Sequence, residues 1–406
     1  MIMNDKLKNV LLNANKNVPY YRDLFFKNNI DITNMSELSS FQRIPLLDKE
    51  AITNNFSNFI SEAYDSSELS YEYTSGSTGI PLKIAKSHKD RVMQGQIMWK
   101  NRISTYDITP DSPYCTWHIK GPSIYAYKNR LQFSCVKLED ECLRQYAEAI
   151  IEHKPEWLFG GAETWFVLAE YMENNGYKAP KSIRFIESTG EQLRPETAKF
   201  LSDYFECPVD NLYGCIEMYG IARSTNGTKL RIMENNVYLE IVDENGKVKP
   251  EGQFGNIVLT SMNNDAMPFI RYKIGDVGRV LNGTSSEGKY KYLELKRTRV
   301  NERINIGTKI DIDADIFHCA IERLNRSPDY TILQYKIYQK AVREFDVYIR
   351  LKEGGDGITE RVKMDYLKEI EIYGLGNCDW KIEFVDRITL DEMTGKYQYF
   401  VRLEDK

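Results

Sequence analysis

Short β-prone runs alternate with amphipathic helical segments between residues 138 and 217. The helical segments cover 138–154, 162–176 and 194–206, and each is followed by a strand-like run: EWLFGG, SIRFIEST and VDNLYGC. Strands that alternate with helices are typical of a mostly parallel sheet covered by helices. Ligands of such sheets bind where the strands end, so the loops GGAE, STGE and YGCIE are expected at one binding face.

The pattern changes near residue 228. NVYLEIVDENGKVKPEGQFGNIVLTSM contains strand-like runs joined by Glu-Asn-Gly and Glu-Gly turns, which predicts a β subdomain over about 228–295. A charged stretch poor in apolar residues follows at 296–302, and helices and strands then mix again. We therefore expect an α/β fold with a large N-terminal domain, 1–298, and a small mobile α+β C-terminal domain, 299–406.

Composition excludes several classes of protein. The chain has 406 residues, of which 42% are hydrophobic, and its net charge of -5 gives no basic footprint for nucleic acid or an anionic membrane. No apolar run approaches the ~20 residues of a membrane span, and a secretory signal is missing, so we expect a cytoplasmic protein. The seven cysteines show no C-x-x-C spacing and the four histidines no metal-binding pattern. Free thiols and no metal site built by the protein alone are expected.

A loop of Ser, Thr and Gly interrupts two strand-like runs in YEYTSGSTGIPLKIAKSH, residues 71–88. Gly76 and Gly79 let backbone N–H groups approach an anion closely, and Ser75, Ser77 and Thr78 add hydroxyl donors. A polyphosphate suits such a loop, although Ser, Thr and Gly also form ordinary solvated hairpin loops. A Walker-type loop is disfavoured because Ile80 and Pro81 stand where that motif needs Lys and Ser or Thr.

Aromatic residues gather in the segment TPDSPYCTWHIKGPSIYAY, residues 109–127. Trp117 and His118 in this segment, with Phe159 further along, could line a pocket for an organic substrate. The same residue types fill protein cores equally well. The sequence leaves both interpretations open.

Taken together, these motifs resemble those of the adenylate-forming ligases, and within them the phenylacetate-CoA ligase-like branch that includes capsule-biosynthesis homologues. The resemblance runs from PYYRDLF and IPLLDKEAI near the amino end to TGKYQYF near the carboxyl end. It implies that YTSGSTGIP is the phosphate loop that holds ATP and the leaving pyrophosphate. The implied phosphate-binding residues are Ser75, Gly76, Ser77, Thr78 and Gly79.

The resemblance assigns the remaining motifs to nucleotide and metal. STGE, with Gly190 and Glu191, resembles the turn that meets the adenine. NLYGCIE, with Gly214, resembles the motif in which Tyr213 stacks on adenine and Glu217 binds Mg²⁺, but Ile216 replaces the usual hydroxyl residue.

Three further positions follow from the same resemblance. IRYKIGD implies that Asp276 grips the ribose hydroxyls. Arg297 aligns with a ribose-contacting arginine, although KRTRVNE departs from the family's hinge motif of Gly-Arg-x-x-Asp. TGKYQYF implies that Lys396 reaches the substrate carboxylate and the α-phosphate.

The implied reaction is the ATP-dependent activation of a small-molecule carboxylic acid. The aromatic residues of segment 109–127 and Phe159 suggest that this acid is an aryl acid. The products are acyl-AMP and pyrophosphate, and the acyl group then passes to CoA or another thiol. One alternative passes the acyl group to an amine or hydroxyl in capsule or natural-product tailoring. A second is a nucleotide-binding homologue without turnover. The resemblance also suggests a homodimer.

Overall fold

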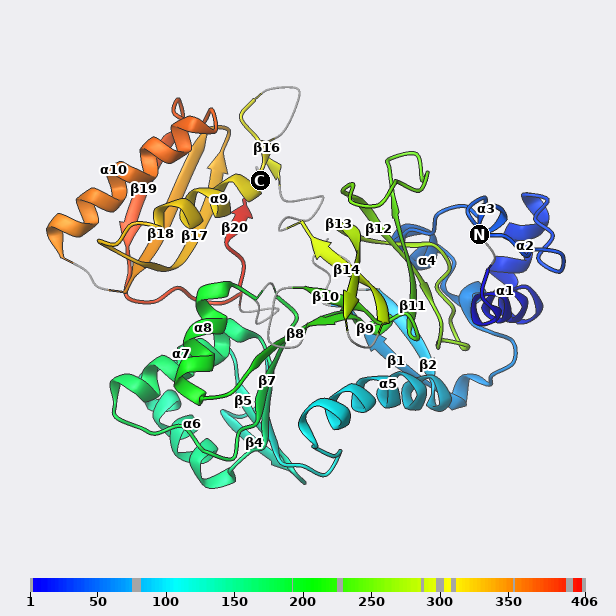
Figure 1. The fold of residues 1–406 in the computed structure, drawn as a ribbon, viewed down its shortest axis with the longest axis horizontal. Coiled ribbons are helices and arrows are strands. Elements are labelled where there is room, and N and C mark those ends of the chain that lie inside the picture. Colours follow the sequence, from blue (N-terminus) through cyan, green and yellow to red (C-terminus); the bar gives the residue numbers. More distant parts are fainter. Residues whose placement is uncertain are drawn as a thin grey trace.

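The computed structural model describes residues 3–74, 82–191, 193–224, 229–285, 288–296, 303–307, 312–352, 355–391 and 397–403. We refer to the described residues up to 296 as the large part and to those from 303 as the small part. Figure 1 shows the small part, coloured from yellow to red, above the green helices of the large part. Among the described residues, no helix combines the length and apolar character that a membrane crossing requires.

The chain begins with short helices whose ends are set by local capping residues. They are α1 (Asp5–Asn17), α2 (Pro19–Lys27), α3 (Leu38–Phe41) and α4 (Lys49–Asn54). The side chains of Asn4 and Asp48 each accept the backbone N–H of the third residue of α1 and α4, and Pro19 starts α2 with its fixed φ. Two 3-10 turns, Phe56–Phe59 and Ser66–Glu68, complete this region. The apolar faces of these elements pack on one end of the main sheet.

An antiparallel ribbon precedes the longest helix. Strands β1 (Leu69–Tyr73) and β2 (Lys83–Ser87) pair in register, so the strand–loop–strand expected around the Ser/Thr/Gly loop is present on both of its described sides. Helix α5 (His88–Tyr106) starts at Ser87, which forms a reciprocal capping box with Asp90. The capping box fixes the direction in which the chain leaves the ribbon.

Within the described residues, twelve strands form one sheet in the order β11-β12-β13-β14-β10-β9-β8-β7-β6-β3-β5-β4. The strands β5, β3, β6, β7 and β8 run parallel, as the alternation of strands and helices predicts, and the others join antiparallel. The strand bounds are β3 (Tyr114–His118), β4 (Ile124–Tyr127), β5 (Arg130–Ser134), β6 (Trp157–Gly160), β7 (Phe185–Thr189), β8 (Val209–Cys215), β9 (Tyr219–Ser224), β10 (Leu230–Ile232), β11 (Val237–Val242), β12 (Gly255–Ser261), β13 (Tyr272–Ser285) and β14 (Gly288–Leu295). The strands expected from 228 onward therefore extend the same sheet.

Both faces of the parallel strands are covered. Leu158 of β6 packs in a core with α6 (Asp140–His153), α7 (Ala162–Asn174) and α8 (Pro195–Phe205). Its neighbour Trp157 points to the opposite face, where its ring lies 5.8 Å from that of Trp99 on α5. Successive residues of a strand face opposite sides, which explains the continuous apolar run WLF.

The small part is an α+β unit with its own core. Strands β15 (Arg303–Ile304) and β16 (Ile312–Asp313) lead into α9 (Asp315–Leu324), and α10 (Asp356–Ile372) follows later. The strands β17 (Ile332–Ala341), β18 (Glu344–Leu351), β19 (Asp379–Phe384) and β20 (Phe400–Arg402) pair in the order β19-β18-β17-β20. The expected fold class is confirmed. The division at residue 298 lies outside the described residues and stays a prediction.

Candidate active site

The segment YGCIE begins in the last three residues of β8, the last parallel strand, and meets the motif IRYKIGD, most of which lies on β13. Tyr213 Oη donates a 2.6 Å hydrogen bond to a carboxylate oxygen of Asp276. A side chain at Gly214 would place its Cβ 1.9 Å from the carbonyl oxygen of Tyr219, so only glycine fits this β-bulge. The structure thus brings together two residues that the sequence assigns to adenine and ribose.

Glu217 lies almost buried at the end of the same loop, with 4% of its surface exposed. Its Oε1 accepts a 3.0 Å hydrogen bond from Tyr272 Oη, and burial together with this carboxylate raises the pKa of Tyr272. A carboxylate is a suitable ligand for Mg²⁺. No cluster of three His, Cys, Asp or Glu that could hold a metal occurs in the described part of the chain. The role of Glu217 in binding Mg²⁺ stays a prediction.

Lys86 is a residue of this site that the sequence analysis missed. Its ammonium is fully buried and donates to the Ile216 carbonyl at 2.7 Å and to Gln94 Oε1 at 2.9 Å. Its Nζ lies 3.4 Å from a carboxylate oxygen of Glu72 and 3.4 Å from the centre of the Tyr219 ring. Burial lowers the pKa of Lys86 to about 8, against the raising effect of Glu72.

These contacts join the ribbon that carries the Ser/Thr/Gly loop to the loop that carries Glu217. One feature of the sequence could have indicated this role. Lys86 stands two residues after Ile84, and alternate residues of a strand share a face, so Lys86 lies on the same face as the fully buried Ile84.

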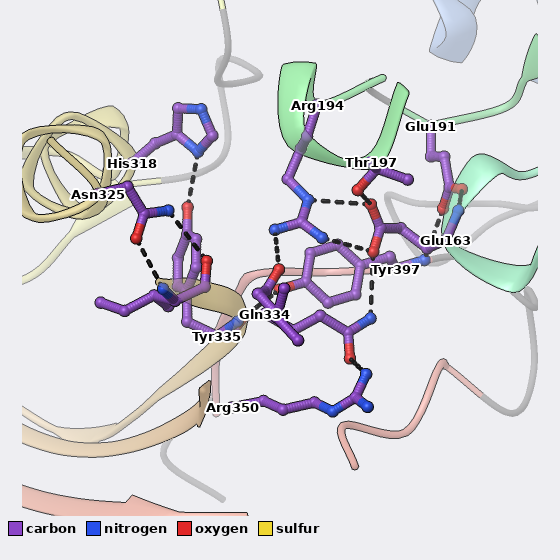
Figure 2. Close-up of polar contacts among 12 residues, drawn as sticks. Glu163, Glu191, Arg194, Thr197, His318, Asn325, Gln334, Tyr335, Arg350 and Tyr397 are labelled. Carbon is purple, nitrogen blue, oxygen red and sulfur yellow. Dashed lines mark hydrogen bonds and ion pairs between the residues drawn. The ribbon is translucent and has the colours of Figure 1, made fainter. Parts of the chain in front are cut away.

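The turn STGE carries a half-buried carboxylate, that of Glu191, with two backbone partners. Gly190 has a φ of 86°, a conformation that glycine adopts readily. Glu191 Oε1 accepts the backbone N–H of Glu163 at 2.8 Å, and Oε2 accepts the N–H of Tyr397 at 3.1 Å. Burial and the nearby Glu163 carboxylate raise the pKa of Glu191 to about 7. The second contact crosses from the large part to the small part, as Figure 2 shows.

Several predicted site residues lie outside the described residues: Ser75, Gly76, Ser77, Thr78, Gly79, Arg297 and Lys396. Their flanks are described. Thr74 donates its backbone N–H to the Leu82 carbonyl at 3.0 Å, and the Leu82 backbone N–H donates to the Thr74 hydroxyl at 2.9 Å, so the residues on either side of the Ser/Thr/Gly loop meet. Tyr397 directly follows Lys396 in the sequence. The roles of these seven residues stay predictions.

The expected pocket residues lie near the end of β3 and β6. The Trp117 ring lies 4.6 Å from the ring of Trp165, and its indole N–H has no hydrogen-bond partner in the part of the chain that the structure describes. Burial lowers the pKa of His118. Phe159 packs on the ring of Trp157 at 5.8 Å. Core packing thus accounts for the rings of Trp117 and Phe159, and the substrate pocket stays a prediction.

Comparisons with known proteins agree with this geometry. A family model described as AMP-binding enzyme matches residues 60–264. The phenylacetate-coenzyme A ligase of Pseudomonas putida is 22% identical over 291 residues, which are 69% of this chain and 66% of that protein. The chain therefore spans about two thirds of that ligase. Protein CapK of Staphylococcus aureus is 22% identical over 393 residues, 92% of this chain and 82% of CapK.

A ligase with the same fold has been solved in two states. The chain matches 2-hydroxyisobutyryl-CoA ligase in its postadenylation state, in complex with an acyl-AMP, with a TM-score of 0.76 and 16% identity over 98% of this chain and 88% of that chain. The same ligase in its thioesterification state gives a TM-score of 0.61 at 17% identity and the same coverage. The chain thus superposes better on the first of these two structures. The resemblance and fold class expected from the sequence are confirmed.

Proposed function

Because the chain belongs to the AMP-binding enzyme family, we propose that it activates a carboxylic acid with ATP. The products of the first step are acyl-AMP and pyrophosphate, and the acyl group then passes to CoA or another thiol. The contact between Tyr397 and Glu191 is the observation that carries the proposal. It brings Tyr397, the residue that follows Lys396 in the sequence, to the turn expected at the adenine.

The proposed binding residues follow the motifs. Tyr213 and Asp276, which share a hydrogen bond, would hold the adenosine of ATP, with Gly190, Gly214 and Arg297 beside it. Ser75, Gly76, Ser77, Thr78 and Gly79 would hold the phosphates. Glu217 would hold the Mg²⁺ ion that neutralises them.

The chemistry requires two anions to meet, because a carboxylate attacks the α-phosphorus of ATP. Catalysis of this kind depends on positioning and on neutralising charge, with little need for a general base. Lys396 would supply an ammonium to the carboxylate and the α-phosphate. Lys86 would help to position Glu217, because its ammonium donates a hydrogen bond to the carbonyl of Ile216, the residue before Glu217.

A second acceptor chemistry is kept because the fold also matches that of the amide bond synthetase McbA from Marinactinospora thermotolerans, with a TM-score of 0.53 and 16% identity over 82% of this chain and 68% of that chain. In this alternative, the acyl group passes from acyl-AMP to an amine or hydroxyl. A nucleotide-binding homologue without turnover is the third candidate, to which Ile216 lends weight. A homodimer and a cytoplasmic location stay predictions from the sequence.

Exchange of labelled pyrophosphate into ATP, measured across a panel of aryl and aliphatic acids, tests adenylate formation. Lys396→Ala is expected to lower this exchange by orders of magnitude while the fold and ATP binding persist. Exchange close to that of the wild type would refute the role of Lys396. Adding CoA or an amine to the acid that reacts then separates the two acceptor chemistries.

A further inference from the structure

A buried polar network joins the large and small parts. Glu163, near the start of α7, accepts hydrogen bonds from Arg194 Nε at 2.9 Å, Arg194 Nη2 at 2.7 Å and Thr197 Oγ1 at 2.7 Å. A fourth donor comes from the small part, where Gln334 Nε2 lies 3.1 Å from Glu163 Oε2. Burial opposes ionisation of Glu163, but Arg194 and these hydrogen bonds hold its pKa below the ordinary value. The Glu163 carboxylate is therefore shared between both parts.

The segment after Lys396 is held by the same network. Tyr397 donates its backbone N–H to Glu191, and its ring lies 5.4 Å from the Arg194 guanidinium. The hydroxyl of Tyr397 donates to the carbonyl of Tyr335 and accepts the Tyr335 N–H at 3.0 Å. Arg194 also donates to the Leu333 carbonyl at 2.5 Å. We call Glu163, Glu191, Arg194, Thr197, Gln334 and Tyr397 the docking network (Figure 2).

Two ion pairs surround the docking network. Arg350 on β18 pairs with Glu170 on α7 and donates to Gln334 Oε1 at 3.4 Å. Arg387 pairs with Asp140 at the start of α6 at 3.1 Å and donates to the Leu138 carbonyl. Contacts of the small part thus reach the amino-terminal ends of three helices of the large part, through Asp140 of α6, Glu163 of α7 and Arg194 before α8.

The chemistry of these contacts suits reversible docking. Among the described residues of the small part, Leu333 is the apolar side chain that packs against the core of α6, α7 and α8. The remaining contacts described above are hydrogen bonds, ion pairs and the cation–π contact between Arg194 and Tyr397. Water can replace such contacts when the parts separate, whereas an exposed apolar interface would resist separation. The same fold is solved in two arrangements, with TM-scores to this chain of 0.76 and 0.61.

We infer that the docking network and the Glu170–Arg350 pair are positioning elements that hold the small part, with the segment next to Lys396, in the arrangement for adenylate formation. This inference rests on the proposed function. It predicts that the network favours the first half-reaction and must open for the second. Weakening it should therefore slow adenylate formation without slowing acyl transfer.

The Glu170–Arg350 pair offers the cleanest test, because it lies at the edge of the interface and the side chains keep 19% and 13% of their surface exposed. Glu170→Arg and Arg350→Glu each place like charges opposite one another, and the double variant restores opposite charges. Glu148→Arg is a matched control, since Glu148 pairs with Arg144 on the surface of α6.

Hydrogen exchange of the full chain without substrates gives a readout independent of activity. We expect faster exchange in the peptide that contains Tyr397 in both single variants, unchanged exchange in the β18–β19 ladder, and recovery in the double variant. Unchanged exchange at Tyr397 in the single variants would overturn the inference. If the wild type activates no acid in the panel, the proposed function fails while this measurement still tests the docking.

The kinetic readout separates positioning from general damage. Pyrophosphate exchange should fall about tenfold or more in the single variants. The second half-reaction is measured with synthetic acyl-AMP, made from the acid that supports the fastest pyrophosphate exchange. Acyl transfer from this acyl-AMP should remain at or above the wild-type rate. An equal loss of both half-reactions, or no recovery in the double variant, would contradict the inference. Glu148→Arg should leave both half-reactions unchanged.

Discussion

The hydroxyl of Tyr213 donates a 2.6 Å hydrogen bond to the carboxylate of Asp276, across 63 residues of sequence. The two residues belong to separate motifs, one at the end of β8 and one on β13. Their contact brings the proposed adenine and ribose positions together, and the Tyr213 hydroxyl orients the Asp276 carboxylate.

Asp276→Ala should mainly weaken nucleotide binding, because the proposed ribose contact is lost. Hydrogen bonds to a charged group contribute about 1.5–3 kcal/mol, so the Kd for ATP should rise about tenfold or more. Tyr213→Phe keeps the aromatic ring and removes only the hydroxyl, so a smaller rise is expected. Isothermal titration with ATP measures both. An unchanged ATP affinity in Asp276→Ala would rule out the ribose role.

Lys86→Met should destabilise the site, since it leaves the Ile216 carbonyl and Gln94 without their buried donor. The expected loss in the free energy of unfolding is about 1–3 kcal/mol. Denaturant unfolding measures this loss, and Lys86→Arg tests whether the charge alone suffices. The lowered pKa of Lys86, about 8, adds a pH dependence.

As the pH rises, Lys86 loses its proton at a lower pH in the folded chain than in the unfolded chain. Between pH 8 and the ordinary lysine pKa of about 10.4, the unfolded state therefore binds more protons. The stability of the wild type relative to Lys86→Met should therefore rise over this range. A constant difference would show that Lys86 titrates normally.

Glu191→Gln should change the pH dependence of stability in the opposite sense. The pKa of Glu191 is raised to about 7, above the ordinary value of about 4.3, so the folded state holds the proton more tightly. The contribution is present at low pH and is lost as the pH rises toward 7. Thermal unfolding from pH 5 to 8 should show the Tm of the wild type falling relative to that of Glu191→Gln. Parallel Tm curves for the two proteins would refute the raised pKa.

Gly161→Ala should disturb the Glu191 carboxylate directly. A Cβ at Gly161 would lie 2.7 Å from Glu191 Oε1, the oxygen that accepts the Glu163 N–H. We expect faster hydrogen exchange at Tyr397 and a lower Tm. Gly95→Ala on α5 is the control, because a Cβ there meets nothing within 4 Å and should stabilise the helix by up to about 1 kcal/mol. A Tm for Gly161→Ala equal to that of the wild type would contradict the close packing of residue 161 against the Glu191 carboxylate.

The sequence predicted what short-range patterns encode. The alternation around Leu158 predicted buried parallel strands, and the turns after 242 predicted antiparallel ones, because periodicity and turn residues act within a few residues. The resemblance to the adenylate-forming ligases pointed to Gly190 and Gly214.

The contacts that organise the site are long-range, and the sequence did not predict them. Lys86 reaches a carbonyl 130 residues away, and Glu191 accepts an amide 206 residues away. Nothing in the local pattern of STGE distinguishes a carboxylate that meets a ligand from one that anchors Tyr397. Such pairings depend on how distant elements pack.

The continuous sheet has a consequence for how this protein can be divided. A fragment that ends near residue 228 would keep β9 but lose its neighbour β10, which pairs along it through Arg223 and Ala222. The edge of β9 would then present unpaired backbone groups, and such edges attach to other chains and aggregate. Fragments cut within the sheet are therefore expected to precipitate, whereas a cut after residue 296 leaves all twelve described strands together.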